Sequence, residues 1–339
     1  MQIALDAMGG DHGPEELIGG ALLAVRQANL QVTLVGNQHI LQAHLDRLRG
    51  GDKGLSQIKI VHAAEVVEMG ESPVEAIRRK KNSSVVVAFD LVRQGLADAA
   101  VSAGNSGATM AAAVRKLGRM EHVSRPGIAS IFPTLKKPVV MMDVGANVDC
   151  RPQHLFQFAV MASAFSHIFD INRPRIGLLS IGEEVGKGNT LVKETYARLA
   201  ASSLNFVGNV EGRDVFQGNV DVIICDGFVG NICLKLSEGL AEAAMQMLKD
   251  EIMKSTAAKI GYFLARPAFR AFAKRVDYAE YGGAPLLGVN GIGIICHGKS
   301  SAEAIKNAIL EASKMVEKRV NQKITAGLAA NAQDEETVS

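Results

Sequence analysis

The chain has 339 residues, of which 47% are hydrophobic and 21% are charged, and its formal net charge at pH 7 is +2. This balance excludes a largely disordered chain and supplies enough apolar residues for one large α/β core or two lobes. Because only 5% of the residues are aromatic and Trp is absent, base stacking is not expected, and we predict no nucleic-acid partner.

Ten short apolar runs predict strands, at residues 2–6, 31–36, 58–62, 98–102, 128–133, 138–143, 175–181, 205–211, 220–226 and 292–296. Helical patterns separate most of them, with marked helix starts at Pro14, Ser72 to Glu75, Pro152 and Ser300 to Glu303. The run Val85 to Val92 is ambiguous, because its valines favour a strand while its length and flanking serines favour a helix. The alternation predicts an α/β fold, with a doubly wound, mostly parallel sheet of about ten strands and helices on both faces.

No linker rich in Pro, Gly or Ser divides the chain, so we predict that residues 1–320 form a single two-lobed catalytic unit. From about residue 232 to 280 the pattern changes to long helices without a strand, which predicts a protruding helical hairpin. The apolar pattern is lost after Val320, so residues 321–339 are interpreted as a frayed C-terminal tail.

The cysteines form no CxxC pair and have no histidine at metal-ligand spacing, which favours reduced thiols; they are Cys150, Cys225, Cys233 and Cys296. No secretory signal opens the chain, and no uncharged apolar run is long enough to span a bilayer. We therefore expect a cytoplasmic protein that associates with membranes peripherally at most.

Four apolar runs end in small residues that include Asp or Asn, at Ile3 to Asp11, Val101 to Gly107, Val139 to Asn147 and Ile223 to Asn231. Ligands of parallel α/β sheets bind beyond the carboxyl ends of the strands, so these loops predict one shared pocket. A helix that begins just after such a loop offers free N–H groups to an anion, typically a phosphate.

Two nucleotide motifs are nearly present, and both are rejected. Gly293 to Ser300 matches the P-loop pattern formally, but Ile294 to Cys296 are typical of a strand rather than of a loop around phosphate. The first turn, Gly9 to Gly13, lacks the dinucleotide fingerprint, and the second predicted strand ends in Gly36 and Asn37 instead of an acidic residue. Neither nucleotide hydrolysis nor an ordinary nicotinamide site is predicted.

Asp6, Asp11, Asp143, Asp226 and His12 could be read as a magnesium or acid–base cluster. However, an aspartate at a strand end more often accepts hydrogen bonds from the loop that follows it. A loop-ordering hydrogen bond is likewise the better interpretation of His12 than a role as proton donor. We expect no metal site and no cofactor.

Lys187 lies between two glycines just after a predicted strand, where it suits contact with an anion, and Asn189 and Thr190 can cap the next helix. Asn231 stands at the start of the long helix. It is either a simple N-cap or a donor of an amide N–H to developing negative charge.

Within the predicted hairpin, apolar and aromatic side chains alternate with basic ones. The apolar set is Ile260, Tyr262, Phe263, Leu264, Phe269 and Phe272, and the basic set is Lys259, Arg266, Arg270, Lys274 and Arg275. At a helix–loop–helix tip this mixture fits insertion into an anionic membrane surface. A hairpin that forms a dimer explains the same pattern equally well.

Together, five ordered motifs resemble the phosphate acyltransferase family of bacterial phospholipid synthesis, PlsX: Leu5 to Pro14, Ser102 to Gly107, Met142 to Asn147, Asp226 to Asn231 and Tyr281 to Gly288. The likeness covers about residues 1–320. It implies a fold similar to isocitrate and isopropylmalate dehydrogenases and to phosphotransacetylase. It also implies a homodimer that makes acyl-phosphate from fatty acyl-(acyl carrier protein) and inorganic phosphate.

That chemistry needs no Ser or Cys nucleophile, because phosphate is itself a nucleophile at neutral pH and needs only positioning and charge stabilisation. By the resemblance, Lys187 and Asn231 fall on the essential Lys and Asn of the family. We hypothesise that Lys187 holds phosphate or the oxyanion and that Asn231 donates a hydrogen bond to the tetrahedral intermediate. The other predicted substrate- and phosphate-binding residues are Asp6, Gly9, Gly10, Asp11, His12, Ser102, Gly104, Asn105, Ser106, Gly107, Asp143, Asn147, Asp226, Gly227 and Gly230.

Two other classes of function remain open at this point. One is a related enzyme, either a phosphotransacetylase that uses acyl-CoA or a decarboxylating dehydrogenase. The other is a non-enzymatic adaptor for a carrier protein or a membrane. The expected partners are acyl carrier protein, inorganic phosphate, a second copy of the chain, and either the membrane or the downstream glycerol-phosphate acyltransferase.

Overall fold

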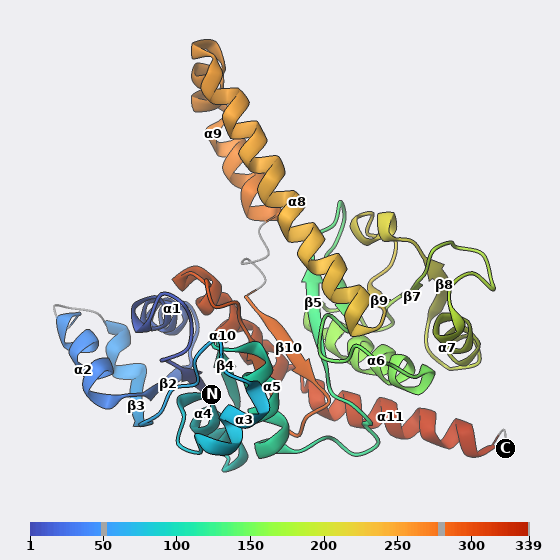
Figure 1. Cartoon of the computed structure of the whole chain (residues 1–339), viewed down its shortest axis with the longest axis horizontal. Helices are drawn as coiled ribbons and strands as arrows, with labels where there is room; N and C mark the ends of the chain where they lie inside the picture. The colour runs from blue at the N-terminus through green and yellow to red at the C-terminus, as the bar shows by residue number, and fades with distance from the viewer. Residues whose placement is uncertain (49–52, 277–281, 338–339) are drawn as a thin grey trace.

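A mixed sheet runs through the computed structural model, which describes residues 1–48, 53–276 and 282–337 (Figure 1). Its strands are β1 (Gln2–Asp6), β2 (Gln31–Gly36), β3 (Ile58–His62), β4 (Ala99–Ser102), β5 (Gly127–Phe132), β6 (Val139–Met142), β7 (Ile176–Leu179), β8 (Phe206–Val210), β9 (Val222–Ile224), β10 (Ala284–Leu287) and β11 (Gly293–Ile295). In the described part of the chain these eleven strands are ordered β3-β2-β1-β4-β11-β10-β5-β6-β9-β7-β8. All ten predicted strands are confirmed, and β10 is additional.

The sheet contains two parallel sets that run in opposite directions. Strands β3, β2, β1, β4 and β11 form one set, and β6, β9, β7 and β8 form the other. Between them β10 is antiparallel to β11 and β5, and β5 is antiparallel to β6. The four strand-end loops therefore follow strands of opposite directions, because three reversals of direction separate the sets.

The strand register nevertheless brings the carboxyl ends of the two sets together. Ile295, the last residue of β11, pairs with Ala284, while Met142, the last residue of β6, pairs with Ala129. Because Leu286 of β10 pairs with Ile128 of β5, both sets end at nearly the same level of the sheet. Their following loops face each other across β10 and β5.

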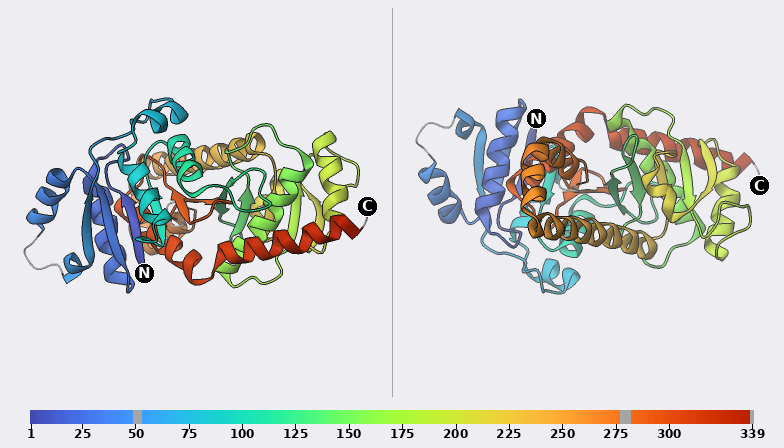
Figure 2. Two further views of the ribbon diagram at one scale, coloured as in Figure 1. Left: turned by 90° about the horizontal axis from the view of Figure 1, so that it is seen from below. Right: turned by 90° about the horizontal axis from the view of Figure 1, so that it is seen from above.

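Helices cover both faces of the sheet, as the doubly wound prediction requires (Figure 2). They are α1 (Pro14–Gln27), α2 (Gln38–Arg47), α3 (Pro73–Arg79), α4 (Ser84–Arg93), α5 (Ser106–Leu117), α6 (Pro152–Phe165), α7 (Thr190–Ala200), α8 (Gly227–Lys254), α9 (Thr256–Val276), α10 (Ala302–Glu317) and α11 (Val320–Thr337), with 3₁₀ turns at Lys53–Gln57, Ser166–Phe169 and Gly212–Phe216. Ile3 and Leu5 of β1 join the core under α1 and α10, while Ala4, between them, joins the core under α4 and α5. This alternation is the two-residue period of a strand buried on both sides.

Most predicted helix starts are confirmed. Helices α1, α3 and α6 begin at Pro14, Pro73 and Pro152, where proline occupies the first turn. The ambiguous run at 85–92 lies in helix α4, which buries Phe89 and packs against α5. Helix α10 begins one residue later than predicted, because Ser301 rather than Ser300 is its N-cap.

The C-terminal tail is not frayed over most of its length. Residues 320–337 form α11, which packs against α6 across the molecule (Figure 2). Val320, Ile324 and Leu328 recur at one-turn spacing and are buried, and the Asn321 amide donates to the carbonyl oxygens of Val289 (3.1 Å) and Gly291 (3.0 Å). A single apolar stripe among polar residues was too weak a pattern to recognise without its packing partner.

Helices α8 and α9 form an antiparallel hairpin that projects from the body (Figure 1). The turn lies at Ser255, so Ile260, Tyr262, Phe263 and Leu264 stand along the first turns of α9 rather than in the connecting loop. The prediction that Phe269 and Phe272 also belong to the tip is wrong, because they lie in the second half of α9, and Phe272 lies at the base of the hairpin. Leu236, Leu240 and Met247 of α8 are 68%, 66% and 68% exposed, so the apolar stripe of this helix is not covered by the rest of the described chain.

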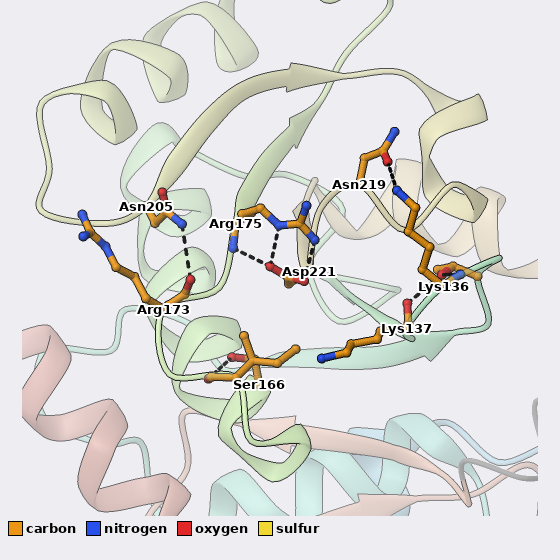
Figure 3. A network of polar contacts seen from close by, with 10 residues as sticks. Lys136, Lys137, Ser166, Arg173, Arg175, Asn205, Asn219 and Asp221 are labelled. Atoms are coloured by element: carbon orange, nitrogen blue, oxygen red, sulfur yellow. Dashed lines mark hydrogen bonds and ion pairs between the residues drawn. The ribbon is translucent and has the colours of Figure 1, made fainter.

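A network of polar contacts joins the strands of the second set at their amino ends (Figure 3). The Arg175 guanidinium donates to both carboxylate oxygens of Asp221, at 3.0 and 2.9 Å, and the Arg175 N–H donates to the same carboxylate at 2.8 Å. Burial opposes ionisation of Asp221, but the hydrogen bonds from Arg175 outweigh it and lower the pKa of the carboxyl. Because this pair precedes β7 and β9, it lies away from the strand-end loops and stabilises the sheet.

Candidate active site

A cavity of about 540 Å³ lies where the two sets of strands end, over β5 and β10. Both sets contribute to its walls, together with the start of α5, the first turns of α8 and the loop before α10. Its lining includes Ser106, Ile128, Val144, Gly145, Asn231, Lys235, Glu238, Gly283, His297, Lys299 and Ser301. Within the described residues, Ser106 and Asn231 are the members of the predicted site that line it.

Asn231 faces the cavity from the second turn of α8. The N-cap of this helix is Asp226, whose carboxylate accepts from the N–H groups of Phe228 (3.0 Å) and Val229 (2.9 Å). The interpretation of Asn231 as an N-cap is therefore wrong. Its side chain lies against Gly145, where an added Cβ would be 3.6 Å from the Asn231 carboxamide, and it makes no hydrogen bond within the described chain. The amide is available to a ligand.

Glycines allow the start of α8 to press against the loop after β6. A Cβ on Gly230 would lie 1.9 Å from the carbonyl oxygen of Asp143, and one on Gly227 would lie 2.6 Å from that of Asn147. The Gly227 N–H donates to the Asn147 carbonyl at 2.8 Å. These contacts hold Asn231 at a set distance from Gly145.

Asp143 organises that loop from within. Its Oδ1 accepts from the N–H groups of Ile128 (3.1 Å), Gly145 (3.2 Å) and Ala146 (3.1 Å). Its Oδ2 accepts from the main-chain N–H and the side-chain amide of Asn147, at 2.7 and 2.9 Å. Burial raises the pKa of Asp143, and these donors oppose that effect. Since five donors occupy the carboxylate, it orders the loop and has little capacity left for a ligand.

Asp6 has the same role on the other set of strands. It accepts from the Ser102 hydroxyl at 2.8 Å and from the Gly9 N–H at 3.2 Å, and burial raises its pKa. The Gly104 N–H donates in turn to the Ser102 hydroxyl at 3.2 Å. A Cβ on Gly9 would lie 2.7 Å from the nitrogen of Gly104, so the two loops touch through their backbones.

The rest of the first loop lies against the segment after β11. Gly10 has φ of +92°, and the Asp11 N–H donates to the Gly298 carbonyl at 2.7 Å. The side chains of Asp11 and His12 are exposed and do not line the cavity.

Two further predicted residues position helix α5. Asn105 is its N-cap: its side chain accepts from the Ala108 N–H at 3.0 Å and donates to the Met69 carbonyl at 2.8 Å. Gly107 permits contact with Pro73, whose Cγ would lie 2.7 Å from an added Cβ.

Lys187 is exposed on the loop between β7 and α7 and does not line the cavity. Its neighbours Gly186 and Gly188 have φ of +92° and +97°, which favour glycine, and Asn189 caps α7 as predicted, accepting from the Val192 N–H at 2.9 Å. Because β7 and β9 are parallel neighbours, the Lys187 loop and the start of α8 follow adjacent strands at the same edge of the sheet.

Sequence reasoning missed several charged residues of the cavity. Lys235 and Glu238 follow Asn231 by one and two helical turns, and His297 and Lys299 follow β11. Burial raises the pKa of Glu238, while the neighbouring Lys235 and His297 oppose the rise. Lys299 could have been found from the Gly298 to Ser300 segment. This segment does not form part of a nucleotide-binding loop, but it does mark the end of a strand. Lys235 and Lys299, beside the carboxyl group of Glu238, give the cavity a positive side that suits an anion.

The described residues 1–48, 53–276 and 282–337 contain no group of three or more His, Cys, Asp or Glu side chains placed to hold a metal ion. None of their helices combines the length and apolar character that crossing a membrane requires.

Known proteins resemble this chain in sequence and in fold. The family model described as "Fatty acid synthesis protein" matches residues 1–323. The phosphate acyltransferase of Pelotomaculum thermopropionicum is 55% identical over 329 residues, covering 97% of this chain and 95% of the relative. That of Geotalea uraniireducens is 54% identical over 332 residues, covering 98% and 95%.

Among solved structures, a phosphotransacetylase from Streptococcus pyogenes has a TM-score of 0.61 at 20% identity, covering 94% of both chains. A 4-hydroxythreonine-4-phosphate dehydrogenase from Klebsiella pneumoniae has a TM-score of 0.53 at 16% identity, covering 92% of this chain and 99% of the other. These structures share the fold, as the sequence resemblance implied. From its family match and its curated relatives, this chain belongs to the fatty acid synthesis protein family of phosphate acyltransferases.

Proposed function

We propose that the chain catalyses the reversible formation of acyl-phosphate from fatty acyl-(acyl carrier protein) and inorganic phosphate, an early step of phospholipid biosynthesis. Family membership supports an acyltransferase over a non-enzymatic adaptor. The observation that carries the proposal is the unpaired Asn231 amide in a cavity that Lys235 and Lys299 also line. This arrangement suits a reaction in which a phosphate and a developing oxyanion must be held together.

In the proposed reaction an oxygen of hydrogen phosphate attacks the carbonyl carbon of the thioester, forming a C–O bond. The tetrahedral intermediate then collapses and the C–S bond breaks. The proton of hydrogen phosphate balances the thiol of the released carrier, so no oxidant, reductant or protein nucleophile is needed. Asn231 donates to the oxyanion, while Lys187, on the neighbouring strand-end loop, holds phosphate or the same oxyanion.

A direct test compares acyl donors. With phosphate supplied, we expect acyl-phosphate from long-chain acyl-(acyl carrier protein), a much lower rate with the matching acyl-CoA, and no reduction of NAD in a parallel reaction. The likeness to phosphotransacetylase favours acyl-CoA as the alternative donor. Equal or faster turnover of acyl-CoA would support that alternative, and no turnover with either donor would refute the proposed function.

We further propose that the hairpin contacts the membrane through α9 while the body stays in the cytoplasm, where the carrier protein docks and the product passes to the downstream glycerol-phosphate acyltransferase. Phe263 and Leu264 are 70% and 75% exposed, and Ile260 is 60% exposed. Lys259 and Arg266, also exposed, lie on the same helix and suit an anionic lipid surface. Leu236 and Met247 of α8, both 68% exposed, support the homodimer, because a second copy would cover them.

Replacing both Phe263 and Leu264 with Gln is expected to weaken binding to anionic liposomes by at least about tenfold, because their apolar surface no longer enters the bilayer. Liposome co-sedimentation measures the effect, and activity with soluble substrates should stay unchanged. The matched control replaces Val74 and Leu96 with Gln in the same way; these two side chains are 74% and 60% exposed and lie outside the hairpin. Unchanged liposome binding together with a dissociated dimer would assign these side chains to the interface between copies instead.

A further inference from the structure

A second hollow, of about 420 Å³, lies at the base of the hairpin, and we call it the base groove. One wall is formed by the end of β5 and the residues that follow it, with the rings of Phe132 and Phe216 tilted against each other at 6.5 Å. The other wall is formed by α8 and α9, including Leu240, Ala244 and Phe272. The surface is mostly apolar, and its volume is typical of small-molecule pockets.

The base groove is continuous with the candidate active site. Ile131, Leu234 and Glu238 line both hollows. On α8, Asn231, Leu234, Glu238, Ala241 and Ala244 recur at steps of three or four residues, which places them along one face of the helix. This stripe leads from the free amide into the groove over a helix rise of about 20 Å.

The charged groups beside the groove leave its walls apolar. The Arg275 guanidinium donates to the carbonyl oxygens of Thr134 and Leu135, at 3.1 and 2.7 Å, and its charge is directed at the backbone. Glu238 stands at the junction with the polar cavity, close to Lys235. A ligand that spans both hollows would therefore place a polar group near Asn231 and an apolar tail in the groove.

Resting on the proposed function, we infer that the base groove binds the acyl chain of the substrate and thereby sets which chain lengths are used. The reacting carbonyl lies beside Asn231, and the hydrocarbon follows α8 towards the hairpin. A second copy of this chain could also cover the apolar walls. The shared lining residues favour the acyl chain, because contact between copies needs no opening into the active site.

The test narrows the groove at two depths. Ala241→Phe fills it close to the cavity, and Ala244→Phe fills it one turn farther along α8. For Ala241→Phe we expect the ratio of kcat/KM for hexadecanoyl- to butanoyl-(acyl carrier protein) to fall at least about tenfold, because the longer chain no longer fits. For Ala244→Phe a smaller fall is expected. The matched control is Ala243→Phe, exposed on the same helix and lining neither hollow, which should keep the wild-type ratio.

Turnover of the short donor shows that each variant is folded. If wild type and variants are active but the ratio does not change in Ala241→Phe, the groove does not hold the acyl chain, while the proposed function stands. If sedimentation velocity also shows a change of association state in that variant, the groove is an interface between copies. If wild type turns over neither donor, the proposed function itself fails, and the inference fails with it.

Discussion

Asn231→Ala is expected to slow acyl-phosphate formation by about 10²- to 10³-fold, the usual cost of removing one oxyanion donor. The amide lines the cavity, makes no hydrogen bond within the described chain, and is held beside Gly145 by the close contacts of Gly227 and Gly230. An alanine there removes the donor and little else, so kcat should fall more than KM rises.

Lys187→Ala is expected to lower kcat/KM by more than tenfold, mainly through weaker saturation by phosphate. The side chain is exposed in this structure, so its removal should leave the free energy of unfolding nearly unchanged. Steady-state kinetics with varied phosphate measure the effect. Lys193→Ala and Asn172→Ala, at exposed positions outside the cavity lining, serve as matched controls. If either Lys187→Ala or Asn231→Ala retained activity within tenfold of wild type, a loss below about 1.4 kcal/mol, its catalytic assignment would be wrong.

Gly230→Ala is expected to lower the free energy of unfolding by at least about 2 kcal/mol. The added methyl would lie 1.9 Å from the carbonyl oxygen of Asp143, a backbone atom that cannot rotate away, so either α8 or the loop after β6 must move. The shift would also displace Asn231 from the cavity, and activity should fall in the fraction that remains folded.

The same helix offers a control with the opposite expected sign. Gly239 lies in the interior of α8, and a Cβ there would meet nothing within 4 Å. Gly239→Ala should therefore stabilise the protein by about 0.5–1 kcal/mol, because alanine loses less backbone entropy in a helix. Urea unfolding followed by circular dichroism compares the two. Equal stabilities for Gly230→Ala and wild type would show that α8 does not press against the Asp143 carbonyl.

Local patterns predicted most of the fold, and the exceptions have physical causes. Strand β10 was not predicted, because its four residues follow two glycines and include Pro285, which has no N–H to donate to a neighbouring strand. Helix α11 was not predicted, because its short apolar stripe can be recognised as a buried face only once it packs against α6. Valines in α4 gave a mixed signal that burial against α5 resolves in favour of a helix.

The sequence predicted those parts of the candidate site that depend on hydrogen bonds between a side chain and the backbone of the loop that follows it. Asp6 and Asp143 at strand ends predicted ordered loops, and their carboxylates accept the loop N–H groups in the structure. Lys235 and Glu238 were not predicted as site residues, because nothing local on a long helix distinguishes a charged residue that faces a cavity from one that faces solvent. His297 escaped for a related reason, since its neighbours suggest only a strand end.

The amino-acid sequence by itself was sufficient to predict the family, the alternation of strands and helices and the glycine-rich strand ends, since each depends on residues close together in sequence. The position of the active site depends on contacts between distant segments. Strands β10 and β5 reverse direction between the two parallel sets, and their register makes both sets end at one level. Asn231 and Lys299 therefore line one cavity, although the strands before them run in opposite directions.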